Sequence, residues 1–408
     1  MLAEELLMTN TILSDRGMGC CNSCCLGFLR GPDKPTNAID RLANRFSRDC
    51  TVTPCSEEPD DDDDDRFHGD SGSFYGQRDR AIYRGVPVKE TGRVWRGRHA
   101  SGKKMINEYT MERKIGCGSY GKVGLYRSNI SGKQYAIKTF SKSRLMRVRV
   151  ALAETAMMDV LREVSIMKTL EHPNIVNLIE VIDDPESDQF YMVLEYVDGE
   201  RICDPSGSPG GIGERSARRY LRDMISGLMY LHAHNIVHGD IKPENILVTR
   251  SGRVKIADFS VSHAFQDDND ELWRSPGTPL FTAPECCLGF SYHGKAADTW
   301  AIGITLYCMV LGHCPFIGDS LQDAYDKIVS DPLSLPAELD PELKDLLGGL
   351  LCKDPMQRIT LDAVAQHSWV VREGGPVPRT SCKCKGSNFR SGNCVRAQPD
   401  FVDSFNLE

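Results

Sequence analysis

Apolar positions recur regularly only in the middle of this 408-residue chain. From about Asn107 to Val371 they repeat at the periods of about 2 and 3.6 residues that are typical of strands and helices. Residues 1–105 lack such a period, and Gly, Pro, Ser and Lys dominate from residue 372 on. The pattern predicts a disordered, acidic, Cys-containing N-terminal tail over residues 1–105, one folded domain over 109–371, and a loose C-terminal tail over 372–408.

Within the folded domain, predicted strands dominate the first part and predicted helices the second. The predicted elements are strands over residues 123–126, 135–138 and 190–194, and helices over 151–170, 217–233 and 298–311, with a last helical pattern that ends near Trp369. Strands that are followed by a run of helices are typical of the α+β class. We therefore expect a smaller, strand-rich lobe followed by a larger, mainly α-helical lobe.

The composition argues against several classes of protein. Hydrophobic residues make up 40% and charged residues 26% of the chain, as in ordinary globular proteins. The formal net charge of -8 gives no reason to expect direct nucleic-acid binding. No apolar run approaches the roughly 18 residues of a transmembrane segment. The 16 Cys are spread over too long a chain for a small disulfide scaffold, which favours a reducing compartment, the cytoplasm or the nucleus.

Two features of the N-terminal tail allow more than one interpretation. The acidic run Asp60–Asp65 repels itself and stays solvated, which favours disorder over a docking or autoregulatory segment. The cluster Cys20-Cys21-Asn22-Ser23-Cys24-Cys25 could contribute to a zinc site, carry lipid or have no role. A zinc site needs a second, well-spaced ligand pair. Membrane anchoring requires translation to start at Met18, so that Gly19 becomes a myristoylation site. We prefer the interpretation that the cluster has no role.

The chemistry concentrates in one stretch of the larger lobe. Asp240, Lys242 and Asn245 stand at positions i, i+2 and i+5, and Asp258 follows after an apolar hairpin. This layout resembles the catalytic and metal-binding loops of protein kinases. In such a loop Asp240 would orient the acceptor hydroxyl and take its proton, and Lys242 would neutralise the transferred phosphoryl group. Asn245 and Asp258 would hold Mg²⁺, which prefers oxygen ligands.

A glycine-rich hairpin precedes this stretch in the smaller lobe. The motif G-x-G-x-x-G-x-V consists of Gly116, Gly118, Gly121 and Val123 and follows Ile115. A dinucleotide-binding fingerprint would need a helix directly after the glycines. A strand follows instead and leads to Ala136 and Lys138, so the motif predicts a loop that closes over ATP. Val123 and Ala136 would cover adenine, Ile115 would lie beside them, and Lys138 would pair with the phosphates.

Lys138 needs an acidic partner from the predicted helix over residues 151–170. Glu163 has the same helical phase as the apolar positions Val160 and Met167 and should face inward, so it is preferred over Glu154.

The run that ends at Leu194 predicts the last strand of the small lobe and the hinge. The backbone of Glu195 and Val197 would face adenine there, Leu194 would be the gatekeeper, and Leu247 would lie under the adenine ring.

Further motifs sharpen the resemblance over about residues 109–371. G-T-P-x-x-x-A-P-E at 277–285, with Lys242 two residues after Asp240, is similar to the serine/threonine kinases. Val181-Ile182-Asp183-Asp184-Pro185 and Cys314-Pro315-Phe316 resemble the calcium/calmodulin-dependent kinase kinases. His238-Gly239-Asp240, Asp258-Phe259-Ser260 and Thr282-Ala283-Pro284-Glu285-Cys286-Cys287-Leu288 are most similar to the plant geminivirus Rep-interacting kinases.

The resemblance implies the two-lobed protein kinase fold. A small lobe over residues 109–196 would hold a five-stranded antiparallel sheet and helix C, and a larger, mainly α-helical lobe would span residues 197–371. ATP and Mg²⁺ would bind between the lobes. It implies that Thr278 bonds towards Asp240 and Lys242, and that Glu285 pairs with Arg358. It further implies an upstream kinase that phosphorylates the activation-loop Thr of the plant counterpart of AMP-activated protein kinase. A geminivirus replication protein is implied as a second binding partner.

The chain departs from the pattern at several points. Gly239 replaces the Arg that usually receives an activation-loop phosphate, so we expect basal activity without a phosphate held there. Ser260 replaces the usual Gly of the metal loop. Ser275 is the candidate for a regulatory phosphate elsewhere. Residues 142–150 are short and basic, and the C-terminal tail lacks an amphipathic basic helix, so calmodulin control is not expected. Gly239 and Ser260 also keep open a rival reading, a pseudokinase scaffold that only binds partner proteins.

Overall fold

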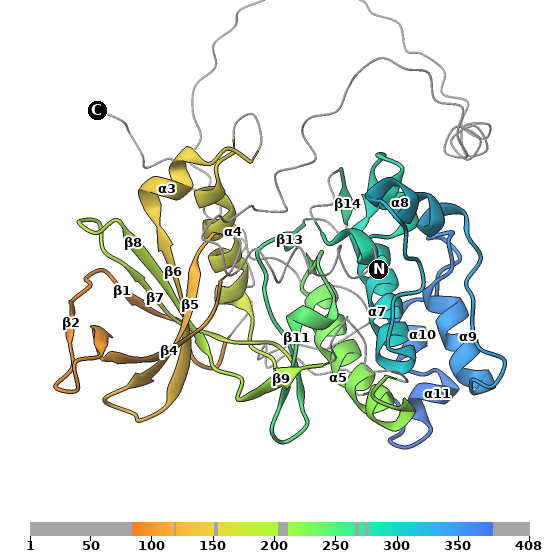
Figure 1. The fold of residues 1–408 in the computed structure, drawn as a ribbon, viewed down its shortest axis with the longest axis horizontal. Coiled ribbons are helices and arrows are strands. Elements are labelled where there is room, and N and C mark those ends of the chain that lie inside the picture. Colours follow the sequence, from red (N-terminus) through yellow and green to blue (C-terminus); the bar gives the residue numbers. More distant parts are fainter. Residues whose placement is uncertain are drawn as a thin grey trace, which may run out of the picture.

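The computed structural model describes residues 84–117, 120–150, 154–202, 211–265, 269–273 and 277–377. The chain forms a lobe built on one twisted sheet and a second lobe built mainly from helices (Figure 1). The predicted α+β class and the two-lobed kinase fold are confirmed. The acidic run, the N-terminal Cys cluster, Gly118, Ser275 and residues 378–408 lie outside the described residues.

The small lobe contains an eight-stranded sheet with the strand order β1-β7-β8-β6-β5-β4-β3-β2. Its strands are β1 (Lys89–Thr91), β2 (Arg96–Arg98), β3 (Lys104–Ile106), β4 (Tyr109–Cys117), β5 (Lys122–Ser128), β6 (Gln134–Ser141), β7 (Leu178–Asp183) and β8 (Gln189–Glu195). The pair β1–β7 is parallel and the other neighbours are antiparallel. The short helix α3 (Lys142–Arg147) and the longer α4 (Ala156–Thr169) follow β6 in sequence.

This sheet corrects two expectations. The resemblance implied five strands, whereas β1, β2 and β3 extend the sheet at both edges. The prediction of a disordered segment up to residue 105 is therefore wrong for residues 84–105. Each added strand is only three residues long, and most of the side chains in β1 and β2 are exposed. Such strands are held by backbone pairing with longer neighbours, which leaves almost no hydrophobic period in the sequence.

Alternation along the strands gives the sheet two buried faces. Ile137, Ile182 and Val193 belong to a small cluster on one face. Phe140, Val181 and Met192, which have the opposite phase, belong to the main core together with the apolar residues of α4. Helix α4 therefore covers the face that continues into the large lobe.

The large lobe is arranged around two long helices, α5 (Glu214–Ala233) and α7 (Gly294–Leu311). Its other elements are β9 (Gly199–Arg201), β10 (Ile236–Val237), η2 (Pro243–Asn245), β11 (Ile246–Thr249), β12 (Val254–Ile256), β13 (His263–Ala264), β14 (Glu271–Leu272), η3 (Pro279–Phe281), α6 (Pro284–Cys287), β15 (Tyr292–His293), α8 (Leu321–Ser330), α9 (Pro341–Leu350), α10 (Leu361–Val364) and α11 (Ser368–Val371). Nearly every residue of α7 from Asp298 to Val310 is buried, as expected for a helix that is apolar on all sides. Gly312 ends it with a left-handed φ of 78°.

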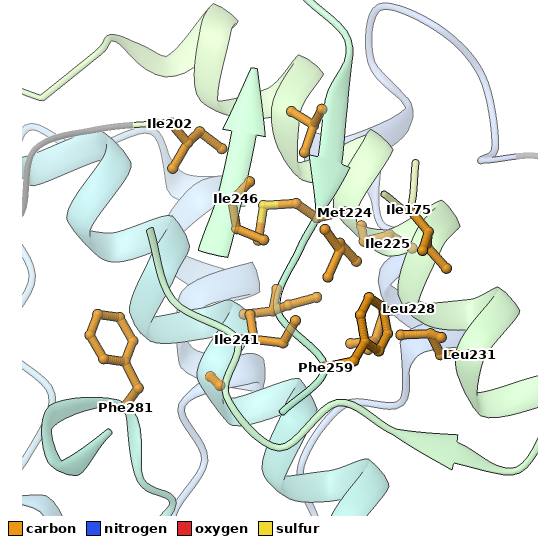
Figure 2. Close-up of a cluster of buried hydrophobic side chains, with 14 of the residues drawn as sticks. Ile175, Ile202, Met224, Ile225, Leu228, Leu231, Ile241, Ile246, Phe259 and Phe281 are labelled. Atoms are coloured by element: carbon orange, nitrogen blue, oxygen red, sulfur yellow. The ribbon is translucent and has the colours of Figure 1, made fainter. Parts of the chain in front are cut away.

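The core extends directly beneath the catalytic loop. Ile241 of that loop and Phe259 of the metal loop are 1% and 0% exposed. Figure 2 shows both side chains in one cluster with Leu228 and Leu231 of α5. Apolar anchors of this kind fix the loop backbone, because a close-packed interior resists displacement of its side chains.

The start of the C-terminal segment is also packed, so the prediction of a loose tail from residue 372 is wrong for residues 372–377. Arg222 of α5 donates to the carbonyl oxygens of Gly374 and Gly375, at 3.0 and 2.5 Å. Arg218 pairs with Glu373 at 2.8 Å, and Val377 is only 6% exposed. No hydrophobic period marks these residues, because their contacts come from polar side chains of α5.

Among the described residues, no helix is both long and apolar enough to cross a bilayer.

Candidate active site

Asp240 lies at the centre of a dense hydrogen-bond network in the loop between β10 and η2. Its Oδ1 accepts from the hydroxyl and the backbone N–H of Thr278, at 2.7 and 3.0 Å. Its Oδ2 lies 2.8 Å from Lys242 Nζ and 2.9 Å from Asn245 Nδ2. Lys242 also donates to the Thr278 hydroxyl at 2.5 Å. The predicted link from Thr278 to Asp240 and Lys242 is confirmed, and it ties the catalytic loop to the segment that closes over it.

A buried carboxylate holds the backbone of this loop. Asp298, at the start of α7, accepts from the N–H groups of His238 and Gly239, both at 2.9 Å. Its Oδ2 also lies 2.9 Å from His232 Nε2, and the Asp298 side chain is 1% exposed. Gly239 has a φ of 78°, a conformation that costs a residue with a side chain free energy. The loop geometry therefore depends on a glycine and on an anchor in the core.

Lys138 forms the predicted ion pair with Glu163. Lys138 Nζ lies 2.7 Å from Glu163 Oε1 and 3.1 Å from Asp258 Oδ1. Glu163 is 3% exposed and projects from the buried face of α4. The competitor Glu154 is instead 41% exposed and lies 3.8 Å from Arg162. The inward phase of Glu163 in the sequence was therefore the correct signal.

The two acids around Lys138 have shifted pKa values in opposite directions. The Lys138 ammonium lowers the pKa of Asp258 to about 2, against the effect of its burial. Burial raises the pKa of Glu163, and the attraction of Lys138 opposes that shift. Asp258 also has a left-handed φ of 65°, which Asp tolerates better than most residues. This backbone directs an ionised carboxylate towards the triphosphate end of the site.

A small cavity opens beside this ion cluster, lined by Tyr120, Gly121, Val123, Lys138, Phe140, Glu163, Asp258 and Ser260. Ile115, Gly116 and Val123 lie on β4 and β5 around the glycine-rich turn. A Cβ on Gly121 would lie 2.5 Å from the carbonyl oxygen of Thr139, so only glycine fits there. The glycine-rich turn therefore packs directly against β6, which carries Lys138.

The hinge follows β8, as predicted. Ala136 pairs with Leu194 across β6 and β8, and Val197 is 9% exposed. The N–H of Glu195 donates to the Asn177 carbonyl, and the Val197 carbonyl accepts from Gly199. The hinge would therefore offer adenine the Glu195 carbonyl and the Val197 N–H.

The opposite wall of the nucleotide site comes from the large lobe. Leu247 lies half-buried on β11, which pairs with β9 directly after the hinge. The side chain of Glu195 is held by Lys255 of β12 at 2.9 Å, a contact that ties the hinge to the floor of the site.

The donor groups of the metal loop suit a hard cation. Asn245 uses its amide nitrogen to bond Asp240, which leaves the amide oxygen as its ligand atom. Asp258 is an anion at neutral pH, since its pKa is about 2. The Asn245 carbonyl accepts from Ala257 N at 2.8 Å, so the two loops are joined next to Asp258. Asn245 and Asp258 thus fit Mg²⁺, which prefers oxygen ligands.

The predictions for the Glu285–Arg358 pair and for Ser275 have different outcomes. Arg358 Nη1 and Nη2 lie 2.6 and 2.8 Å from the two Glu285 oxygens, and the Arg358 side chain is 1% exposed. The implied Glu285–Arg358 pair is confirmed as a buried, bidentate structural contact. Ser275 lies outside the described residues, so its role as a phosphate acceptor stays a prediction.

The arrangement can carry out in-line phosphoryl transfer. Asp240 is placed to accept a hydrogen bond from an acceptor hydroxyl and to take its proton, while Lys242 beside it can neutralise a phosphoryl oxygen. Lys138, fixed by Glu163, is placed to hold a triphosphate. Bound Mg²⁺ would neutralise charge that develops between the β- and γ-phosphates. Most of the catalytic effect would come from positioning and electrostatics.

Sequence analysis missed some of the residues that build the site. Asp298 was taken only as the start of an apolar helix, although an acid inside such a helix is costly unless it is hydrogen-bonded. That cost was the signal that could have identified it. His232 and Lys255 were not singled out, because a lone His or Lys in an amphipathic segment carries no pattern.

Comparison with known proteins agrees with this geometry. The family described as protein kinase domain matches residues 109–370. The serine/threonine-protein kinase GRIK1 of Arabidopsis thaliana is 66% identical over 304 residues, which cover 74% of this chain and 77% of the relative. GRIK2 of the same plant is 65% identical over 306 residues, which cover 74% of this chain and 75% of the relative.

A calcium/calmodulin-dependent protein kinase kinase of Caenorhabditis elegans is 39% identical over 298 residues, which cover 68% of this chain and 54% of the relative. The likeness to the animal enzyme is weaker than the likeness to the two plant proteins, as the motifs indicated. The chain therefore belongs to the protein kinase family, and within it to the serine/threonine kinases of the type represented by the two Arabidopsis proteins.

Proposed function

We propose that this serine/threonine kinase uses Mg²⁺ and ATP to phosphorylate the activation-loop Thr of the plant counterpart of AMP-activated protein kinase. The observation that carries the proposal is the 66% identity to GRIK1 over 304 residues, which cover 74% of this chain. The sequence motifs resemble the geminivirus Rep-interacting kinases, and that resemblance implies this substrate.

The residues around Asp240 are consistent with a protein as the phosphate acceptor. Thr278, Asp240 and Lys242 form one bonded group on the surface where an acceptor hydroxyl must arrive. Cys286, Tyr292 and Ala301 line a hollow that Asp240 and Thr278 also line. A folded protein substrate can present an exposed loop to such a site, whereas a free small molecule would find few groups to bind it.

The test uses the full-length protein, labelled ATP and Mg²⁺. The acceptor is the kinase domain of a plant AMP-activated-type kinase that has been inactivated in its own metal loop. Two controls are matched: Asp240→Asn in the enzyme, and Thr→Ala at the activation-loop position of the acceptor. We expect label on the acceptor that both substitutions abolish.

Other outcomes separate the alternatives. Autophosphorylation with no label on the acceptor would keep the kinase activity and refute the proposed substrate. No transfer to any protein, with ATP still bound, would favour the scaffold reading that rests on Gly239 and Ser260. Against that reading, the contacts of Lys138, Glu163, Asp240 and Asp258 are all in place in the described residues.

A geminivirus replication protein is the second partner that the resemblance implies, and calmodulin is not expected to bind. Immobilised full-length kinase should retain the purified viral protein and should not retain calcium-loaded calmodulin. Retention of calmodulin would overturn that expectation.

A further inference from the structure

Residues 84–106, here called the N-terminal strap, contact both edges of the small-lobe sheet. At one edge β1 runs parallel to β7, with Lys89 opposite Glu180 and Thr91 opposite Ile182. At the other edge β2 and β3 form a hairpin that pairs with β4. Figure 1 shows β1 along β7 and β2 at the far end of the sheet. The strap is therefore part of the lobe that carries Lys138.

The strap is anchored by polar contacts that are too specific for a loosely attached tail. Glu180 is 0% exposed and bonds the Thr91 hydroxyl and Lys89 Nζ, at 2.5 and 3.0 Å. The N–H of Val94 donates to Asp184 at 2.9 Å. A buried carboxylate needs such partners, because burying an unpaired charge is strongly unfavourable. Removing the strap would leave Glu180 without Lys89 and Thr91.

The first residue of the strap binds the end of α4. Arg84 donates from Nη1 to the Met167 carbonyl at 3.1 Å and from Nη2 to the Leu178 carbonyl at 3.0 Å. The Met167 carbonyl also accepts from the N–H of Leu170 at 3.3 Å. The last carbonyls of a helix carry partial negative charge, so a guanidinium is favourable there. One side chain thereby joins the last turn of α4 to β7.

Two neighbouring contacts strengthen this attachment. The N–H of Gly85 donates to Glu171 Oε2 at 2.6 Å, just after α4 ends. Lys168, in the last turn of α4, pairs with Glu90 of β1 at 2.9 Å, although this pair is largely exposed and weak. On the other side, the N–H of Glu171 donates to Tyr230 of α5 at 3.1 Å. The C-terminal end of α4 is thus held between the strap and the large lobe.

The position of α4 decides whether the Lys138–Glu163 pair forms. Glu163 lies one turn before Met167, the residue whose carbonyl Arg84 binds. A shift of α4 would separate Glu163 Oε1 from Lys138 Nζ, which are now 2.7 Å apart. In many kinases a phosphate held by the Arg before the catalytic Asp helps to order this region. Gly239 has no side chain for that purpose, so this chain needs another means to hold the helix.

We propose that the N-terminal strap holds α4 where Glu163 bonds Lys138, and that Arg84 is a positioning residue for phosphoryl transfer. Arg84 does not touch the nucleotide site; it acts through Met167, α4 and Glu163. The proposal rests on the serine/threonine kinase activity of the family and is independent of which protein is the natural substrate. It predicts that activity depends on residues before the start of the catalytic domain at residue 109.

The test compares full-length wild type with Arg84→Ala, Arg84→Lys and Arg98→Ala, with myelin basic protein as a general acceptor. Arg98 is the matched control, since it lies exposed in the same strap and its guanidinium donates to the Gly102 carbonyl of its own hairpin, at 2.9 Å. We expect Arg84→Ala to lower kcat roughly tenfold and Arg84→Lys to lower it by a smaller factor. The kcat of Arg98→Ala should stay within about twofold of wild type. The KM for the acceptor should not change. Circular dichroism at the assay temperature verifies that each variant is folded.

A double-variant cycle separates positioning from a general loss of stability. If Arg84 acts through Glu163, Arg84→Ala should reduce kcat by less than about twofold when Glu163→Gln is already present. An equal loss in both backgrounds would overturn the proposal, because the two residues would then act independently. Activity of Arg84→Ala within about twofold of wild type would overturn it as well.

Discussion

Substitution of Asp298 should uncouple the catalytic loop from the core. In Asp298→Ala the N–H groups of His238 and Gly239 lose their acceptor, and the side chain of His232 loses its partner. A buried donor left without a partner costs about 1–3 kcal/mol, so the two backbone groups cost about 2–6 kcal/mol together. Whole domains are stable by only about 5–15 kcal/mol. We expect the melting temperature to fall by about 5–20 °C.

In Asp298→Ala, kcat should fall by more than the loss of folded protein explains. Gly239 immediately precedes Asp240, and a displacement of about 1 Å at a reacting group can cost about 100-fold in rate. The melting temperature and kcat of Asp298→Asn should lie between those of wild type and Asp298→Ala. The asparagine keeps one acceptor oxygen but turns an NH₂ group towards the other donor. Asp345→Ala is the matched control, since the Asp345 side chain is 82% exposed and its Oδ2 lies 3.1 Å from His367 Nε2.

The measurements are thermal unfolding by circular dichroism and kcat at a temperature where every variant is folded. Asp345→Ala should change the free energy of unfolding by less than about 1 kcal/mol. If Asp298→Ala melted within about 2 °C of wild type and kept its kcat, the loop would be held by its apolar anchor alone and the reasoning would fail.

Three further predictions concern other parts of the domain. Arg358→Ala should lower the free energy of unfolding by about 3–5 kcal/mol, because it leaves Glu285, whose side chain is only 12% exposed, without its cation; a urea titration measures this, and a loss below about 1 kcal/mol would contradict it. Gly239→Ala should cost about 1–2 kcal/mol, since alanine must adopt the φ of 78°; an unchanged urea midpoint would show that the loop relaxes. His172 is buried, which lowers its pKa to about 4, whereas unfolded His takes up a proton near pH 6.5. Its contribution to stability is therefore complete above pH 6.5 and is lost as the pH falls towards 4, so unfolding at pH 5 should need less urea than at pH 7.5. The difference in urea midpoint between pH 7.5 and pH 5 should be smaller in His172→Asn than in wild type. An equal difference in wild type and variant would rule out His172 as its source.

The sequence predicted the parts of the site that carry a pattern. Asp240, Lys242, Asn245 and Asp258 have fixed spacings, and the structure brings the first three into one network. Glu163 was found from its helical phase alone, because an inward-facing acid on an amphipathic helix requires a partner. These residues could be predicted since local spacing determines which side chains meet.

Contacts between distant segments could not be predicted in this way. The N-terminal strap has short strands, and its hold on the lobe comes from Arg84 and Lys89, which meet residues 83 to 94 positions away. Residues 372–377 are held by Arg218 and Arg222 of α5. An isolated Arg or Lys gives no sign of its partner in a single sequence, so sites tied together by such residues appear only in three dimensions.

The central claim is that the contacts described here assemble Lys138, Glu163 and Asp258 without a phosphate held at position 239. The most direct measurement is the initial rate of phosphate transfer by full-length protein that mass spectrometry shows to carry no phosphate. Phosphatase-treated and untreated enzyme are compared on myelin basic protein. We predict transfer without a lag and at a similar rate for both. A lag that ends only after autophosphorylation, or no transfer before phosphate is added, would contradict the claim.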